Sequence, residues 1–192
     1  NAPPSAWRET GVHTRPNLHG LLRYPAMMVP RMQGDIIDVI LAHRPGHCRV
    51  LDPFVGSGTV MTEALVRNLD FTGVDINPLA ALVCEAKAAI DAGADVEGAA
   101  QTVLAALRRD VSETIDVEFP GRTKWFNDLS AVKFSVLRRA IMQVGEIGER
   151  KVMWTVFAET VRLCSNSLTS TYKLHIRKPD DRVAAERVLE TF

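Results

Sequence analysis

The chain has 192 residues, with 23 Lys or Arg, 23 Asp or Glu and a formal net charge of zero at pH 7. This length suits one compact domain. The net charge of zero does not indicate a nucleic-acid-binding protein, but it does not exclude one, because acids elsewhere can balance a basic face. No apolar run could span a bilayer, and three scattered cysteines fit neither a disulfide framework nor a zinc site, so we expect a protein of the reducing cytoplasm.

The N-terminal region predicts an arm followed by a helix. Residues 1–18 are rich in proline and polar residues, which indicates an extended arm. The first residue is Asn rather than Met, which suggests a trimmed piece or a fragment of a longer protein. Apolar residues then recur at helical spacing over about 31–43, and Pro45-Gly46 ends this helix.

A glycine turn follows the first predicted strand, which begins near Arg49 and runs through Asp52. Gly56 and Gly58 let the backbone turn without a Cβ clash, and Thr59 begins the apolar rhythm of a helix. Such a turn brings a ligand close to bare backbone N–H groups, and the carboxylate of Asp52 would attract a cationic group. We therefore expect a small-molecule site here.

Two familiar nucleotide-binding turns fit this segment less well. A phosphate loop needs Lys after its last glycine, but Thr59 follows Gly58, so we reject it. The dinucleotide fingerprint needs a third glycine where Met61 stands, so a nicotinamide-binding protein ranks second.

A second carboxylate stands after the second predicted strand, which begins near Phe71 and ends at Asp75. In a doubly wound sheet, an acid at this place faces the ribose hydroxyls of a nucleotide. Asn77 and Pro78 suit a helix N-cap and a first helical position. The two turns together predict one pocket shaped for an adenosine.

Three segments resemble the S-adenosylmethionine-dependent methyltransferases that modify an exocyclic amine of adenine or cytosine in DNA. They are 52–59, 73–80 and 19–30, the last with Met27 where the family usually has Lys. The resemblance implies an α/β fold of the Rossmann-like class I methyltransferase type, incomplete here and with extra helices. It also implies S-adenosylmethionine as cofactor, S-adenosylhomocysteine as product and DNA as substrate.

The resemblance further implies a cofactor site. In this family the first turn cradles the methionine and sugar portions of the cofactor, and the acid after the second strand binds the ribose hydroxyls. Carried over, the site residues are Tyr24, Pro25, Ala26, Met27, Asp52, Pro53, Phe54, Gly56, Ser57, Gly58, Thr59, Asp75, Ile76 and Asn77.

The rest of the chain predicts mainly helices. Four apolar faces at helical spacing begin near Leu79, Val96, Leu129 and Val152. This predicts a helical subregion at about 95–168 within a single domain over 19–192. Residues 115–119 fit a short edge strand or a loop, and residues 170–177 fit a half-buried strand or an extended loop, before a last helix opened by Pro179.

Glu63 and the five histidines are interpreted as structural rather than functional residues. Glu63 in the first helix after the glycine turn is expected to be solvated. The five histidines form no recognisable ligand spacing, so we expect no metal site and place most of them at the surface or in loops.

The catalytic motif of the family is absent from this sequence. That motif is an Asp, Asn or Ser followed by Pro-Pro and an aromatic residue, and it accepts hydrogen bonds from the target amine while the ring stacks on the flipped base. The sole Pro-Pro pair here is Pro3-Pro4, between Ala2 and Ser5. We therefore expect the cofactor-binding part of a longer or split methyltransferase, inactive alone, with a second polypeptide supplying catalysis and target recognition.

Two further hypotheses remain open at this stage. Similar Asp-Pro-Phe turns occur in guanosine-modifying tRNA and rRNA methyltransferases, so an RNA substrate is the nearest alternative among enzymes. From a different class, the chain would be a non-catalytic subunit that senses the cofactor or supports assembly.

Overall fold

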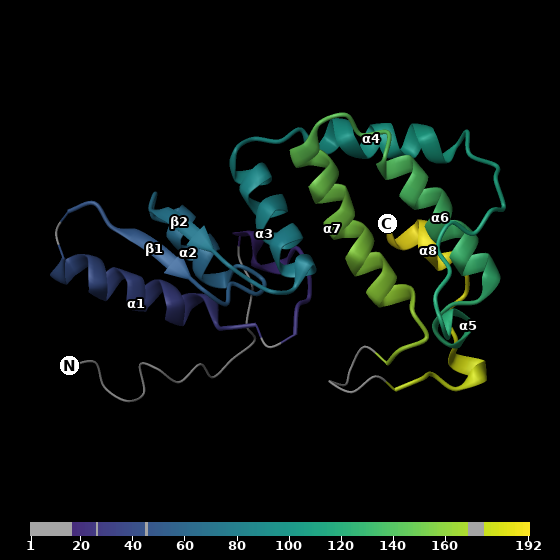
Figure 1. Ribbon diagram of the computed structural model, residues 1–192, viewed down its shortest axis with the longest axis horizontal. Coiled ribbons are helices and arrows are strands. Elements are labelled where there is room, and N and C mark those ends of the chain that lie inside the picture. The colour runs from purple at the N-terminus through teal and green to yellow at the C-terminus, as the bar shows by residue number, and fades with distance from the viewer. Residues whose placement is uncertain (1–16, 26, 45, 169–174) are drawn as a thin grey trace. The chain divides into compact units, whose positions relative to one another are not determined.

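The computed structural model describes residues 17–25, 27–44, 46–168 and 175–192 (Figure 1). The chain folds into two compact units, residues 1–87 and 88–192. Most of the N-terminal arm, residues 1–16, lies outside the described residues, as does most of the segment 170–177 for which a strand or an extended loop is expected.

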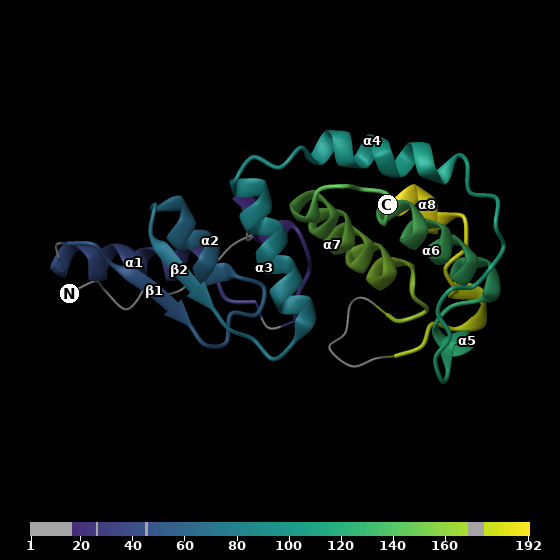
Figure 2. The same ribbon diagram turned by 45° about the horizontal axis from the view of Figure 1, so that its top comes forward.

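The first unit is built around a small parallel sheet. Its elements are η2 (Asn17–Gly20), α1 (Pro30–His43), β1 (Arg49–Asp52), α2 (Thr59–Val66), β2 (Asp70–Gly73) and most of α3 (Pro78–Asp91). Arg49 pairs with Asp70 and Asp52 pairs with Gly73. Because the strands are parallel, α2 serves as the crossover; it packs on both strands, and α1 packs on α2 (Figures 1 and 2).

The boundaries in this unit follow the sequence pattern closely. The predicted helix over 31–43 is confirmed with one more residue, Pro30, at its start. β1 begins at Arg49 and α2 begins at Thr59, as expected. The second strand ends two residues earlier than predicted, at Gly73, so Asp75 lies in the loop beyond it.

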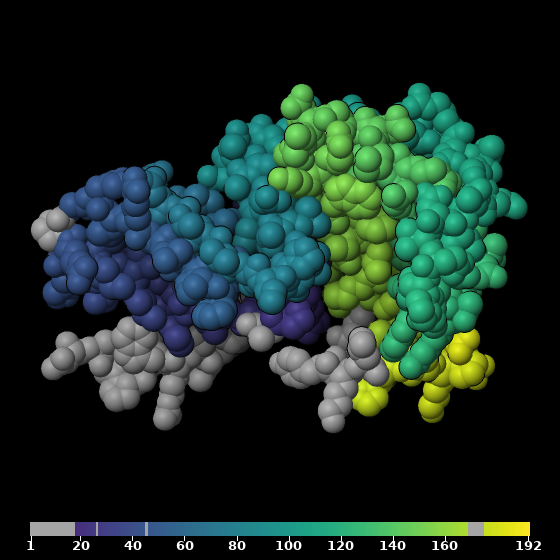
Figure 3. All heavy atoms as spheres, viewed as in Figure 1, coloured from purple at the N-terminus to yellow at the C-terminus, as the bar shows by residue number. Residues whose placement is uncertain are grey.

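The second unit is mainly helical in its described residues. Its elements after the end of α3 are α4 (Val96–Leu107), α5 (Arg122–Trp125), α6 (Asp128–Ile141), α7 (Ile147–Cys164), η3 (Pro179–Asp181) and α8 (Arg187–Thr191). Phe134, Leu137, Cys164 and Val188 form its buried core cluster. Figure 3 shows α7, in light green, on the visible face of this unit.

Two expectations for the second unit are settled by hydrogen bonds. The segment 115–119 is a loop, and Arg139 holds it through Asp116, within the segment, and through Asp110, just before it. The last helix predicted from Pro179 is wrong, because Pro179 opens only the short η3 and α8 begins at Arg187. The backbone is extended between them, where the Val183 N–H donates to the side chain of Asn166.

Among the described residues the architecture is mixed α/β, with eight α-helices and one two-stranded parallel sheet. This confirms the predicted α/β class and is compatible with a methyltransferase fold. A full Rossmann-like sheet is not present in the described part of the chain. None of the described helices is both long and apolar enough to cross a membrane.

Candidate functional site

The turns after β1 and β2 lie side by side because the two strands end in register at the same edge of the sheet. The Val74 N–H donates to the carbonyl of Asp52 at 2.9 Å, and the Val55 N–H donates to the carbonyl of Val74 at 3.0 Å. Pairing therefore continues past the last strand residues. It brings the glycine turn and the loop that carries Asp75 together.

Asp75 is the residue that ties these two turns to each other. Its Oδ2 accepts from the Gly56 N–H and its Oδ1 accepts from the Asn77 N–H, both at 2.8 Å. These backbone donors, first that of Asn77 and then that of Gly56, hold the pKa of the Asp75 carboxyl below its usual range. The carboxylate therefore stays ionised at neutral pH, and its remaining lone pairs can accept hydrogen bonds from a ligand.

Asn77 joins the upstream segment to the same place. Its Oδ1 accepts from the Leu79 N–H at 3.0 Å, as an N-cap does, and its Nδ2 donates to the Tyr24 hydroxyl at 2.8 Å. The ring of Tyr24 lies beside Gly56, where an added Cβ would sit 3.7 Å from Tyr24 Cε1. Three segments that are distant in sequence thus meet at the glycine turn.

The other residues predicted from the upstream segment are less engaged. Pro25 is exposed and Met27 is half-buried, and neither makes a hydrogen bond to the turn within the described chain. Ala26 lies outside the described residues.

Asp52 offers an acceptor that the protein itself does not use. Its Oδ1 accepts from the Phe54 N–H at 3.0 Å. Its Oδ2 is buried and has no hydrogen-bond partner among the residues that the structure describes. A buried, unpaired carboxylate oxygen is costly, so a ligand that donates a hydrogen bond here would be favoured.

Apolar side chains stand next to these acids and face solvent. Phe54 is 84% exposed and Ile76 is fully exposed. Pro53 is also exposed, whereas Ser57, Gly58 and Thr59 are buried in the turn. The arrangement pairs two carboxylates with a flat apolar rim, which suits a ligand that has an aromatic ring and hydrogen-bond donors.

The turn is also held from α3 by two residues that sequence reasoning missed. The Lys87 ammonium donates to the carbonyl of Ser57 at 2.6 Å, and the Cys84 thiol donates to the carbonyl of Gly56 at 3.7 Å. Burial raises the pKa of the Cys84 thiol to about 11, so it remains protonated as a donor. A signal existed in the helical spacing, because Lys87 stands four residues after Val83 on the apolar face.

Glu63 lies in a polar network that fixes the N-terminal segment, and the prediction that it is solvated is wrong. Its Oε1 accepts from the buried His19 at 2.8 Å and its Oε2 accepts from Arg67 at 2.7 Å. Arg67 also binds both carboxylate oxygens of Asp38, and this contact is the first reason why the pKa of Arg67 is raised. The network ties η2 and α1 to α2.

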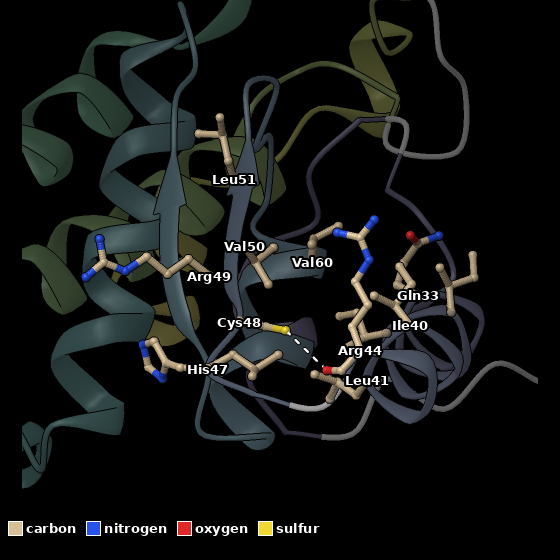
Figure 4. Close-up of a pocket in the computed structure, with 13 residues that line it drawn as sticks. Gln33, Ile40, Leu41, Arg44, His47, Cys48, Arg49, Val50, Leu51 and Val60 are labelled. Carbon is tan, nitrogen blue, oxygen red and sulfur yellow. Dashed lines mark hydrogen bonds between the residues drawn. The ribbon is translucent and has the colours of Figure 1, made fainter.

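A groove of about 550 Å³ opens between α1 and β1, away from the glycine turn. Figure 4 shows Ile40 and Leu41 of α1 on one side and Cys48 and Val50 on the other. The edge of β1 opposite β2 has no partner strand in the described part of the chain. An apolar surface therefore borders an unpaired strand edge.

Comparisons with known proteins give one match. The chain is similar to the type II methyltransferase M.MvaI of Kocuria varians, with 26% identity over 180 residues. The match covers 88% of this chain and 39% of that protein, so the chain spans well under half the length of its relative. No family model matches the chain, and no solved structure matches it significantly.

Proposed function

Because this chain is related to DNA methyltransferases, we propose that it binds S-adenosylmethionine at the turns that follow β1 and β2. The observation that carries the proposal is the meeting of Tyr24, Gly56 and Asp75 in one hydrogen-bonded arrangement. The three residues are far apart in the sequence and meet at one turn, as the parts of a shared binding site must.

The chemistry of each group suits one part of this cofactor. The ionised Asp75 accepts the two ribose hydroxyls, and the exposed side chains of Ile76 and Phe54 flank the adenine ring. The unpaired Oδ2 of Asp52 accepts from the amino group of the methionine portion. The Ser57 N–H of the glycine turn, which has no acceptor among the described residues, faces its carboxylate.

The proposed reaction is methyl transfer to an exocyclic amine of adenine or cytosine in DNA. The bound cofactor supplies a methyl group on a cationic sulfur. In the transfer, the amine nitrogen would take this methyl group as the carbon–sulfur bond breaks, the amine would release a proton to solvent, and S-adenosylhomocysteine would leave. This chain has no Pro-Pro-aromatic motif to accept hydrogen bonds from that amine, so we assign it no catalytic residue.

Catalysis then requires another part of the methyltransferase, on a second polypeptide or a longer chain. The groove between α1 and β1 is the surface we assign to it, with a strand of that part pairing along the unpaired edge of β1. The support is twofold. Parallel sheets are normally covered and wider than two strands, and the relative has more than half of its length outside the match. We also propose that this chain and the part that supplies catalysis act together in the reducing cytoplasm.

Calorimetric titration of the chain tests the cofactor. We expect saturable binding of S-adenosylmethionine and S-adenosylhomocysteine, and no binding of nicotinamide dinucleotides at the same concentrations. Tighter binding of a dinucleotide would overturn the proposal in favour of the nicotinamide alternative.

The substrate is tested by methylation assays with the chain alone and with a candidate second polypeptide, on DNA and on tRNA. Activity on DNA that appears only in the mixture is the expected result. Methylation by the isolated chain would refute the split arrangement, and activity confined to RNA would refute the DNA assignment.

A further inference from the structure

Lys87 is an unusual residue for the place it occupies. Its side chain is 1% exposed, and its ammonium lies 2.6 Å from the carbonyl oxygen of Ser57 and 3.5 Å from Thr62 Oγ1. Burying an ammonium is costly unless hydrogen bonds compensate, and an apolar side chain of similar length would fill the same space without that cost. The position therefore calls for an explanation beyond packing.

The contact controls how the glycine turn presents its backbone. In a planar trans peptide, the C=O and the N–H point in opposite directions. Cys84 and Lys87, three residues apart on one face of α3, draw the carbonyls of Gly56 and Ser57 toward that helix. The N–H groups of Ser57 and Gly58 consequently point away from α3.

The N–H groups of Ser57 and Gly58 differ in whether they have an acceptor within the protein. That of Gly58 donates to the carbonyl of Val55 at 2.8 Å. That of Ser57 finds no acceptor in the described part of the chain, so it is available to a ligand. The carboxylates of Asp52 and Asp75 lie at the same turn, and on their own they would repel an anionic ligand group.

We propose that Lys87 is a positioning residue for the cofactor turn. Its hydrogen bond fixes the Ser57–Gly58 peptide and so holds the turn in the conformation in which the neighbouring Ser57 N–H faces the methionine carboxylate, and its charge offsets the nearby acids. The inference rests on the proposed function, because it concerns how this chain holds the amino-acid part of S-adenosylmethionine. Lys87 itself touches neither the cofactor nor the reacting atoms.

The experiment compares two ligands that differ only in the part Lys87 is proposed to serve. S-adenosylhomocysteine carries the amino-acid part on a neutral thioether, and 5′-methylthioadenosine has the same adenine, ribose and thioether sulfur without it. For Lys87→Met we expect the affinity for S-adenosylhomocysteine to fall about tenfold or more, and the affinity for 5′-methylthioadenosine to change less than about twofold. Calorimetry gives both dissociation constants.

The ratio of the two affinities separates positioning from general support of the fold. A purely structural role would weaken both ligands in proportion, and that result, or unchanged binding of both, overturns the inference. If Lys87→Met does not fold, Lys87→Gln keeps an N–H donor for the Ser57 carbonyl without the charge, and the same ratio is measured. Failure of the wild-type chain to bind either ligand would instead overturn the proposed function, and this inference with it.

Discussion

The two units of the chain hold their loops by different means. In the first unit the glycine turn is fixed mainly by hydrogen bonds from backbone and amide groups, such as the Gly56 N–H on the Asp75 carboxylate and the Asn77 amide on the Tyr24 hydroxyl. In the second unit the loop after α4 is fixed by ion pairs of Arg139 with Asp110 and Asp116. The contacts around the glycine turn leave acceptors and apolar side chains open to a ligand, whereas each ion pair of Arg139 uses the charges of both partners. We therefore place the proposed binding chemistry in the first unit, and the second supplies a helical core.

The largest expected effect tests that core. Leu137 is fully buried in α6, so Leu137→Ala should lower the free energy of unfolding by about 2–5 kcal/mol. Leu129→Ala in the same helix is the matched control, because Leu129 is 66% exposed and should change stability little. Urea unfolding measures both. Equal losses of unfolding free energy in the two variants would show that the buried cluster does not stabilise the second unit.

The next effect tests the binding chemistry of the first unit. Asp75→Asn should weaken S-adenosylmethionine about tenfold or more, because a charged acceptor for the ribose hydroxyls is lost. Asp70→Asn is the control at the opposite end of β2, where the acid is exposed and pairs with His47 and Arg49. Calorimetry should show near wild-type binding for the control. Comparable losses in both variants would contradict a specific role for Asp75.

A smaller effect distinguishes a glycine needed for space from one needed only for backbone conformation. Gly58 and Gly93 both have positive φ, at 72° and 87°. A Cβ at Gly58 would lie 2.9 Å from the Cys84 sulfur, whereas nothing lies within 4 Å at Gly93. Gly93→Ala should cost about 1–2 kcal/mol from left-handed strain, and Gly58→Ala more than that.

Thermal and urea unfolding of both variants provide the comparison. Gly58→Ala should also weaken cofactor binding, because the clash displaces α3 or the turn. Gly93→Ala should leave binding unchanged. The reverse order of stabilities would contradict the close packing of the turn on α3.

The smallest effect is in the response of two acids to salt. The pKa values of Asp75 and Asp110 are both below the usual range, the first because of backbone N–H groups and the second because of the Arg139 side chain. Salt screens an ion pair at the surface more than a hydrogen bond to a neutral donor. Raising the salt concentration should therefore raise the pKa of Asp110 and leave that of Asp75 nearly constant, as carboxyl NMR titrations would measure.

The sign of the linked stability change is the same for both acids. Each has a folded-state pKa below its unfolded value, so each stabilises the fold above the unfolded pKa, and that contribution is lost as the pH falls through the folded pKa. High salt should reduce the loss of stability at low pH that is due to Asp110, and it should leave the loss that is due to Asp75 nearly unchanged. If salt changed the pKa values of Asp75 and Asp110 by the same amount, the two units would not hold their loops by different kinds of contact.

The parts of this molecule that could be predicted from sequence are those set by local rules. Gly56 and Gly58 with Thr59 mark the turn and the start of α2, and Asn77 with Pro78 marks the start of α3. The last helix could not be placed, because the Val183 N–H bonds to Asn166, a partner far away in sequence.

The candidate site divides in the same way. The positions of Asp52 and Asp75 after two predicted strands indicate a binding role, and the family resemblance alone predicts one for Tyr24. The role of Lys87 could not be predicted because its partner is a backbone carbonyl 30 residues away. The burial of Glu63 could not be predicted because its partner is His19, 44 residues away. Long-range polar contacts of this kind have no local signature, and only helical spacing hinted that Lys87 would be buried.

The unpaired edge of β1 has a practical consequence for handling the protein. A bare strand edge beside an apolar groove is a template for copies of the same chain, so the isolated polypeptide should self-associate as its concentration rises. Leu51, two-thirds exposed on β1, is the place to introduce a charge, and Leu51→Lys should keep a preparation monodisperse in sedimentation at concentrations where the unmodified chain forms larger species.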